Sequence, residues 1–297
     1  MSAENITMSI GKSGKHKVKH DQRTLNIANY MQMERLPEVP QHVDWTQKKT
    51  TPWGMMNNWT LEDCTCAAAG HMIECWTANA KSEHIIQDGV VMQAYIALTG
   101  YDPATGANDH GVSLLDALNY WRRAGIGNHR IRAYAKIHDH TGRDHVKAAI
   151  YFFGGVYVGL DLPRSIKGQE IWDVMPGGLE GANQPGSRGY HAVPVLAYDD
   201  EYLTCVSYGQ VQKMTWKFWD TYCAESYAIL TNDFLNQNET PLGLDMAALH
   251  ADLAAITGGP VTTAASAAGA SGTSASSAGT SAGSAGTKAG ASGKSGS

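Results

Sequence analysis

The spacing of apolar residues in the first half of the chain is that of helices. Three segments carry apolar side chains at positions i, i+3, i+4 and i+7, the pattern of a helix with one buried face. Asp63 is a suitable N-cap for the first, and Gly100 and Gly125 are suitable C-terminal stops for the other two. We therefore expect helices in CTCAAAGHMIECWTANA (64–80), SEHIIQDGVVMQAYIALTG (82–100) and GVSLLDALNYWRRAGIG (111–127).

After Gly127 the pattern becomes that of strands. Short runs rich in β-branched and aromatic residues are bounded by turn residues, with one helical segment, DHVKAAIYFFG (144–154), among them. A helical first half and a β-rich second half predict an α+β protein of two lobes with a cleft between them. The expected strands are RIRAYAKI (130–137), GGVYVGLDL (154–162), HAVPVLAYD (191–199), EYLTCVSYG (201–209), KMTWKFWDTY (213–222) and ESYAIL (225–230).

Composition changes near both ends and sets the expected domain limits. The last 40 or so residues are almost entirely Ala, Gly, Ser and Thr, which bury too little apolar surface to offset chain entropy. The segment LDMAALHADLAAI before them has helical spacing. We predict a flexible arm (1–35), a folded domain (36–235) with a helical lobe (58–127) and a β-rich lobe (128–235), a short helical appendage (236–257) and a disordered tail (258–297).

Charge and cysteine content exclude several classes of protein. A formal charge of −5 argues against a mainly electrostatic nucleic-acid binder. No window is apolar over the roughly 18 residues of a membrane helix, and the N-terminus lacks the apolar region of a secretory signal. Five cysteines do not suggest a disulfide framework, so we expect a cytoplasmic protein, although non-classical export leaves no sequence mark. Nothing in the sequence implies a cofactor or an oligomeric state.

Cys64 is a candidate nucleophile because of its place at a helix start. The positive end of the helix dipole stabilises a thiolate and lowers the thiol pKa, although the adjacent carboxylate of Asp63 acts in the opposite direction. The alternative is a cysteine that is buried in the core and has only a packing role. A thiol nucleophile also needs a base. His191 is the strongest candidate, at the start of an apolar strand after a Gly-rich loop, and its alternative is a hydrogen-bonded core histidine.

A zinc site is the rival chemistry in the same window. Cys64, Cys66, His71 and Cys75 are all potential ligands, but along one helix they point in different directions and cannot surround one ion. The segment HDHTGRDH (138–145) reads as a polar turn more readily than as a metal loop. We therefore predict no metal site.

In their order along the chain, these motifs resemble the papain-like cysteine peptidases. VPQHVDWTQKKTTPWGMMNNWTLEDCTCAAAGHMIE resembles the start of a mature enzyme, with the nucleophile opening the central helix. HGVSLLDALNYWRRAGI is similar to the segment after the glycines that line the substrate cleft. HAVPVLAYDDEYL resembles the strand that begins with the catalytic histidine, and VSYG resembles the turn that follows. The resemblance spans residues 39–230 and implies the two-lobed fold of that family.

The resemblance also implies roles for individual residues. Cys64 would attack an acyl carbon as a thiolate paired with His191, and the Cys64 N–H and the Asn58 side chain would donate to the oxyanion. Gly111 would line the cleft, where the missing side chain lets a peptide backbone come close. The orienting partner of His191 falls on Ser207 by one alignment and on Val206, which cannot do this, by another.

Several positions depart from the family pattern. Asn58 is one methylene shorter than the usual glutamine, and Trp59, which would contact substrate, replaces a glycine. Thr65 stands where the family has tryptophan, and the segment before the first match is short for the family's inhibitory propeptide. The sequence therefore predicts a thiol hydrolase, a peptidase or amidase forming a thioester acyl-enzyme on a peptide or amide substrate. The alternative is a papain-like binding or structural module with weak or lost catalysis.

Overall fold

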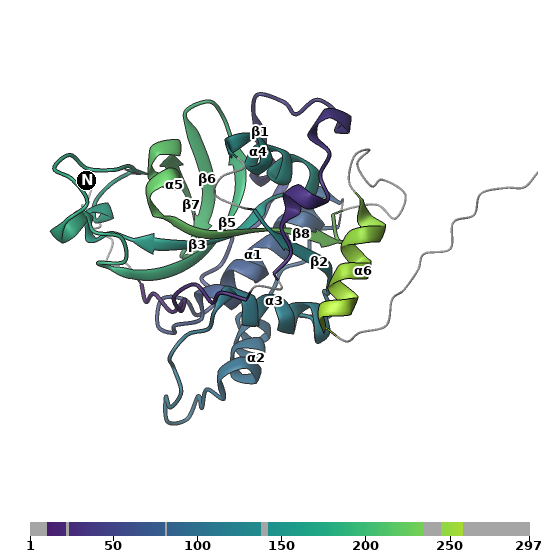
Figure 1. Cartoon of the computed structure of the whole chain (residues 1–297). Helices are drawn as coiled ribbons and strands as arrows, with labels where there is room; N and C mark the ends of the chain where they lie inside the picture. Colours follow the sequence, from purple (N-terminus) through teal and green to yellow (C-terminus); the bar gives the residue numbers. More distant parts are fainter. Residues whose placement is uncertain (1–10, 22–23, 81, 138–141, 235–244, 258–297) are drawn as a thin grey trace, which may run out of the picture. The chain divides into compact units, whose positions relative to one another are not determined.

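The computed structural model describes residues 11–21, 24–80, 82–137, 142–234 and 245–257 (Figure 1). All of them fall within the first of two units of the chain, residues 1–262. The predicted Ala/Gly/Ser/Thr tail (258–297) and residues 138–141 of the polar turn lie outside the described residues. Within the described ranges, no helix combines the length and the apolar character needed to cross a membrane.

Three helices form where the apolar spacing predicts them: α1 (Cys64–Asn79), α2 (Asp88–Thr99) and α3 (Leu114–Arg123). Nearly every residue of α1 is buried, because the helix packs against α2, α3 and the strand β5 (Gly189–Tyr198). Gly100 ends α2 with a φ of 72°, a left-handed conformation that glycine adopts without strain. Ser113 caps α3 by accepting a hydrogen bond from the backbone N–H of Asp116.

The second half of the chain forms most of an eight-stranded sheet in the order β2-β8-β3-β5-β6-β7-β4, with β1 paired to β5. Neighbouring strands are antiparallel, apart from the parallel pair β4 and β7. The helix α4 (Gly142–Phe153) contacts β8, β5 and β3. The predicted α+β class is confirmed. The remaining strands are β1 (Val43–Asp44), β2 (Ile131–Lys136), β3 (Val156–Leu162), β4 (Ile171–Trp172), β6 (Tyr202–Ser207), β7 (Gln210–Thr215) and β8 (Cys223–Thr231).

One predicted strand is half wrong. Residues 213–222 were expected to be extended, but β7 ends at Thr215 and the helix α5 (Trp216–Tyr222) follows. The side chain of Thr215 caps this helix by accepting from the backbone N–H of Phe218. Four aromatic side chains of α5 are buried at helical spacing, so packing overrides the strand preference of an aromatic-rich run.

The N-terminal residues that the structure describes pack against the rest of the unit, which corrects the expectation of a flexible arm. Ile27, Tyr30 and Met31 are buried in the core. The Tyr30 hydroxyl donates to the Asp252 carboxylate at 2.7 Å, on the helix α6 (Met246–Thr257). The helical appendage predicted for 236–257 is therefore present from residue 246, and residues 236–244 lie outside the described residues.

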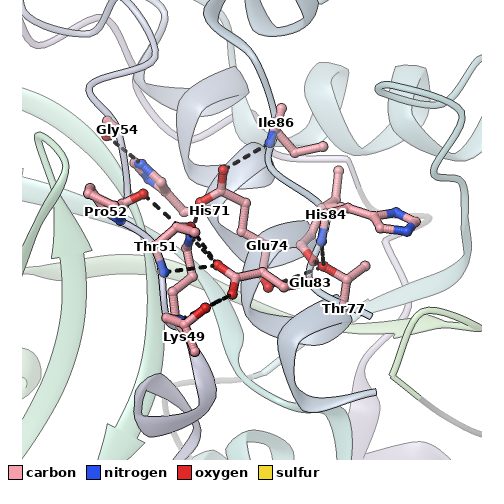
Figure 2. A network of polar contacts seen from close by, with 12 residues as sticks. Lys49, Thr51, Pro52, Gly54, His71, Glu74, Thr77, Glu83, His84 and Ile86 are labelled. Carbon is pink, nitrogen blue, oxygen red and sulfur yellow. Dashed lines mark hydrogen bonds and ion pairs between the residues drawn. The ribbon is translucent and has the colours of Figure 1, made fainter. Parts of the chain in front are cut away.

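A buried ionic network fixes the loop that leads to α1 (Figure 2). The Lys49 ammonium, on a side chain 2% exposed, lies 3.3 Å from the Glu74 carboxylate of α1 and 2.8 Å from that of Glu83. The Glu83 carboxylate also accepts from the backbone and hydroxyl groups of Thr50 and Thr51. Charged groups taken out of water need such partners, so this network holds residues 49–51 and 83 against the side of α1.

Candidate active site

Cys64 is the first residue of α1 and is 0% exposed. Burial raises the pKa of its thiol to about 12, although hydrogen bonds from the backbone of Ala192 and Gly14 favour the thiolate. The expected lowering of the thiol pKa by the helix dipole is therefore wrong for this state, because loss of water outweighs it. The contact with Ala192 puts the sulfur beside the residue that follows His191.

His191 lies on β5 and is 1% exposed. Its Nε2 is 3.1 Å from the hydroxyl oxygen of Ser207, the last residue of β6. The structure thus brings Ser207 to the imidazole, while Val206 packs with Trp53 in a small apolar cluster. The Nδ1 of His191 is buried and has no hydrogen-bond partner among the described residues. Burial lowers the His191 pKa to about 3, so the ring is neutral at pH 7.

Tyr208 is a site residue that the sequence reasoning missed. Its ring stacks on the His191 imidazole, with centroids 4.6 Å apart and planes 16° from parallel. Trp59, which is 40% exposed, contacts the Tyr208 ring edge-on, with ring centroids 6.1 Å apart. Tyr208 has a φ of 49°, and the following Gly209 has a φ of 70°, so the VSYG turn folds the ring back over the histidine. The signal available in the sequence was this turn motif, directly after the residue that orients His191.

Asn58 is buried close to Cys64, but its amide is engaged elsewhere. The side-chain nitrogen donates to a carboxyl oxygen of Asp63 at 3.2 Å and to the Leu61 carbonyl at 3.4 Å. Burial raises the Asp63 pKa to about 8, so this carboxyl group is protonated at pH 7. The oxyanion role of Asn58 stays a prediction, and it requires the amide to turn away from Asp63.

Residues 11–16, which we call the covering segment, lie over Cys64 and link the two halves of the chain. The Val112 N–H donates to the Gly14 carbonyl at 3.0 Å, and the His16 N–H donates to the Val112 carbonyl at 3.1 Å, forming a parallel bridge. On the other side, the Lys15 N–H donates to the Tyr190 carbonyl at 3.1 Å. The backbone of Gly14 contacts the sulfur, so this segment, which was expected to be part of a flexible arm, contributes to the burial of the thiol.

Two glycines allow the close approach of the covering segment. A Cβ on Gly111, whose φ is 76°, would lie 1.6 Å from the Gly14 carbonyl oxygen. A Cβ on Gly14 would lie 1.8 Å from the Glu62 carbonyl oxygen. Gly111 was expected to admit a peptide backbone, and a backbone segment of the chain itself lies there.

No group of three or more His, Cys, Asp or Glu side chains within the described ranges is arranged to hold a metal ion. Cys64, Cys66 and Cys75 are buried as free thiols. His71 instead bonds the Gly54 carbonyl at 3.1 Å through Nε2 (Figure 2), and burial lowers its pKa to about 4. The cysteine and histidine side chains of α1 therefore have separate surroundings.

Known proteins resemble this chain in structure but not detectably in sequence. No protein-family model and no curated protein sequence matches this chain. Among solved structures, xylellain, a cysteine protease from Xylella fastidiosa, is similar with a TM-score of 0.57 and 16% identity, over 75% of this chain and 98% of that chain. Digestive procathepsin L 3 of Tenebrio molitor gives 0.48 at 10% identity, over 75% and 76% of the two chains. The Carica candamarcensis cysteine protease CMS1MS2 gives 0.46 at 12%, over 65% and 99%. The likeness to xylellain is enough to conclude that this chain has the fold of the papain-like cysteine proteases.

Proposed function

We propose that the chain is a thiol-dependent hydrolase, a cysteine peptidase or amidase in which Cys64 is the nucleophile and His191 the base. One observation carries the proposal. The thiol at the start of α1 accepts a backbone hydrogen bond from Ala192, the residue after His191, whose Nε2 is held by Ser207 and whose Nδ1 has no partner among the described residues. A nucleophile, a base and a group that orients the base are the parts that such chemistry requires.

The reaction follows from these groups. His191 takes the thiol proton, and the Cys64 sulfur attacks the amide carbon, while the Cys64 N–H and the Asn58 amide donate to the oxyanion. The carbon–nitrogen bond breaks, the imidazolium gives its proton to the leaving amine, and a thioester forms. Water, deprotonated by His191, then attacks the thioester and releases the acid and the free thiol.

This reaction needs the covering segment to leave the sulfur. Burial holds both Cys64 and His191 in their neutral forms, with thiol and imidazole pKa values of about 12 and about 3. Departure of residues 11–16 would return water to the Cys64 sulfur and remove the main cause of its raised pKa. The structure is therefore that of a resting state of the proposed enzyme.

A binding module with weak or lost catalysis is the second candidate. The observation that favours it is the Asn58 amide, which is bonded to the Asp63 carboxyl group and so is not free to donate to an oxyanion. If the chain proves active and Asn58→Ala leaves its turnover unchanged, Asn58 has no part in the mechanism. If Asn58 is an oxyanion donor, Asn58→Ala reduces turnover by about 10- to 1,000-fold.

The test combines thiol labelling with peptide hydrolysis. The full chain is treated with iodoacetamide at pH 6, the labelled cysteine is mapped by mass spectrometry, and hydrolysis of a mixed peptide library is followed. The same measurements are made on Gly14→Ala, in which the added Cβ cannot fit against the Glu62 carbonyl. We expect selective labelling of Cys64 and cleavage of peptides, both lost in His191→Ala.

Cys223 provides the matched control, because it is a partly exposed cysteine on a different element, the strand β8. Cys64→Ser should abolish hydrolysis, whereas Cys223→Ser should not. If neither the wild-type chain nor Gly14→Ala cleaves any peptide, and Cys64 reacts no faster than a free thiol, the hydrolase is refuted and the binding module remains.

A further inference from the structure

Lys15 of the covering segment reaches into a group of acidic residues on the sheet. The residue is 3% exposed, and its ammonium lies 3.1 Å from the Glu225 carboxylate and 4.0 Å from that of Asp161. The Tyr190 ring centroid is 5.5 Å from the same nitrogen. We call Asp161, Glu225, Gly159 and Tyr190 the lysine site, since together they surround this side chain.

The sheet register explains why the four residues of the lysine site gather. Gly159 pairs with Glu225 between β3 and β8, and Asp161 pairs with Tyr190 between β3 and β5. Because side chains alternate along a strand, residues 159 and 161 share one face with their partners. A Cβ on Gly159 would lie 2.2 Å from the Cε atom of Lys15, so the absence of a side chain there makes room for the long aliphatic stem.

Glu225 makes the lysine site selective for charge. Glu225 is 0% exposed. One of its carboxylate oxygens accepts from the Tyr227 hydroxyl at 2.9 Å, and the other faces the Lys15 ammonium. A carboxylate taken out of water is costly unless a cation accompanies it. Once the covering segment leaves, the site favours a new cationic side chain of similar length over an apolar or acidic one.

The lysine site lies next to the reacting sulfur. Gly159 also pairs with Ala192 in the β3–β5 register, and the backbone of Ala192 is hydrogen-bonded to Cys64. In the covering segment, the residue directly before Lys15 is Gly14, whose backbone touches the same sulfur. A peptide laid along Val112 and Tyr190 therefore places one side chain in the lysine site while its neighbour lies at Cys64.

We propose that the lysine site selects substrate peptides that carry a lysine, seated between Glu225 and Asp161 in the position that Lys15 occupies at rest. The inference rests on the proposed hydrolase for its catalytic part, but binding at the lysine site is independent of turnover. Lys15 is then an internal occupant that any substrate has to replace.

The catalytic arm of the test compares two sets of otherwise identical peptides, with lysine or norleucine at the selected position. With the Gly14→Ala chain, we expect kcat/KM to favour lysine by about 30-fold or more, the usual scale for a buried charge pair that loses one partner. Glu225→Gln should reduce that preference to about 3-fold or less, because it removes the charge and keeps the shape. Asp200→Asn, which alters a carboxylate 76% exposed on a turn, should keep the preference.

The binding arm does not need catalysis. A fluorescein-labelled peptide with the sequence of residues 11–19, GKSGKHKVK, is titrated by anisotropy into a Cys64→Ser, Lys15→Ala chain, against the same peptide with norleucine in place of its second lysine, at position 15. The lysine form should bind at least about 30-fold more tightly, and the difference should vanish in Glu225→Gln. The Cys64→Ser chain with its own Lys15 is a second host, in which the peptide must compete with the covering segment.

The two arms separate the two proposals. Selective binding without hydrolysis overturns the hydrolase and leaves the lysine site standing. Hydrolysis of lysine and norleucine peptides at equal rates, or equal binding of both in the Lys15→Ala host, overturns the lysine site and leaves the hydrolase standing.

Discussion

Replacing Gly14 by alanine should expose and activate Cys64. The new Cβ would lie 1.8 Å from the Glu62 carbonyl oxygen and 2.2 Å from its carbon, which are backbone atoms of the loop before α1 and cannot turn aside. The covering segment therefore has to lift at this point and give up the bond from Val112 to the Gly14 carbonyl. Water then reaches the sulfur, and the burial that raises its pKa is relieved.

The size of the effect follows from ionisation. With a pKa of about 12, roughly one thiol in 100,000 is ionised at pH 7. A free cysteine with a pKa of about 8.5 is about 3% ionised, a gain of roughly 3,000-fold. The less basic thiolate is intrinsically about 40-fold less nucleophilic, since reactivity follows the pKa with a slope of about 0.4–0.5. The net increase is about 100-fold before better access of the reagent is counted.

The assay is the rate of iodoacetamide labelling at Cys64, followed at pH 7 by mass spectrometry of the peptide that contains it. Gly89→Ala is the matched control, because its Cβ on α2 meets nothing within 4 Å. Circular dichroism establishes that both variants are folded. A folded Gly14→Ala chain that labels within about 3-fold of wild type would refute the conclusion that the covering segment suppresses Cys64.

Three further outcomes are expected. In the wild-type chain the Asp63 carboxyl group, with a folded pKa of about 8, holds a proton that the unfolded chain releases near pH 4, so folding loses stability as the pH rises. Asp63→Asn removes this loss, so its stability in urea unfolding should rise relative to wild type by about 1.4 kcal/mol per pH unit between pH 5 and 7. Parallel stability curves of the two chains would contradict this. Lys49→Met should lower the unfolding free energy by about 3–5 kcal/mol by leaving the buried Glu74 carboxylate without its cation, while exposed Lys48→Met should change it by less than about 0.5 kcal/mol. Ser207→Ala should slow peptide hydrolysis by about 5-fold, the scale of one hydrogen bond to His191, and shift the acidic limb of its pH profile, with Ser207→Thr restoring both; an unmoved profile would leave the hydroxyl a purely structural role.

The parts of the fold with local signals could be predicted from the sequence. Each of α1, α2 and α3 combines helical apolar spacing with a plausible end signal, and the central strands are short apolar runs between turns. The motif order predicted that His191 meets the start of the VSYG turn but left Ser207 and Val206 as alternatives, and the structure places the Ser207 hydroxyl 3.1 Å from the imidazole. The α5 helix was missed because an aromatic-rich run of ten residues fits a strand as well as a helix until its packing partners are known.

The covering segment could not be predicted because its contacts are distant in the sequence. Its hydrogen bonds run to residues 112 and 190, and its ion pair runs to residue 225. Locally, the run GKSGKHKVKH has the composition of a solvated basic tail, and nothing in it marks Lys15 as buried. The Cys64 pKa was expected to fall because of the helix start. It rises instead, because the sulfur is buried away from water.

The hydroxyl of Ser207 has a consequence for the proton on His191. A hydroxyl can rotate to donate to the Nε2 nitrogen or to accept from it, whereas an amide oxygen in that place could only accept and would hold the proton on Nε2. Ser207 therefore leaves both neutral tautomers of the imidazole accessible. An exchange between them still requires the ring proton to leave one nitrogen and a proton to be taken up at the other, and rotation of the Ser207 O–H bond lets the same hydroxyl match either form.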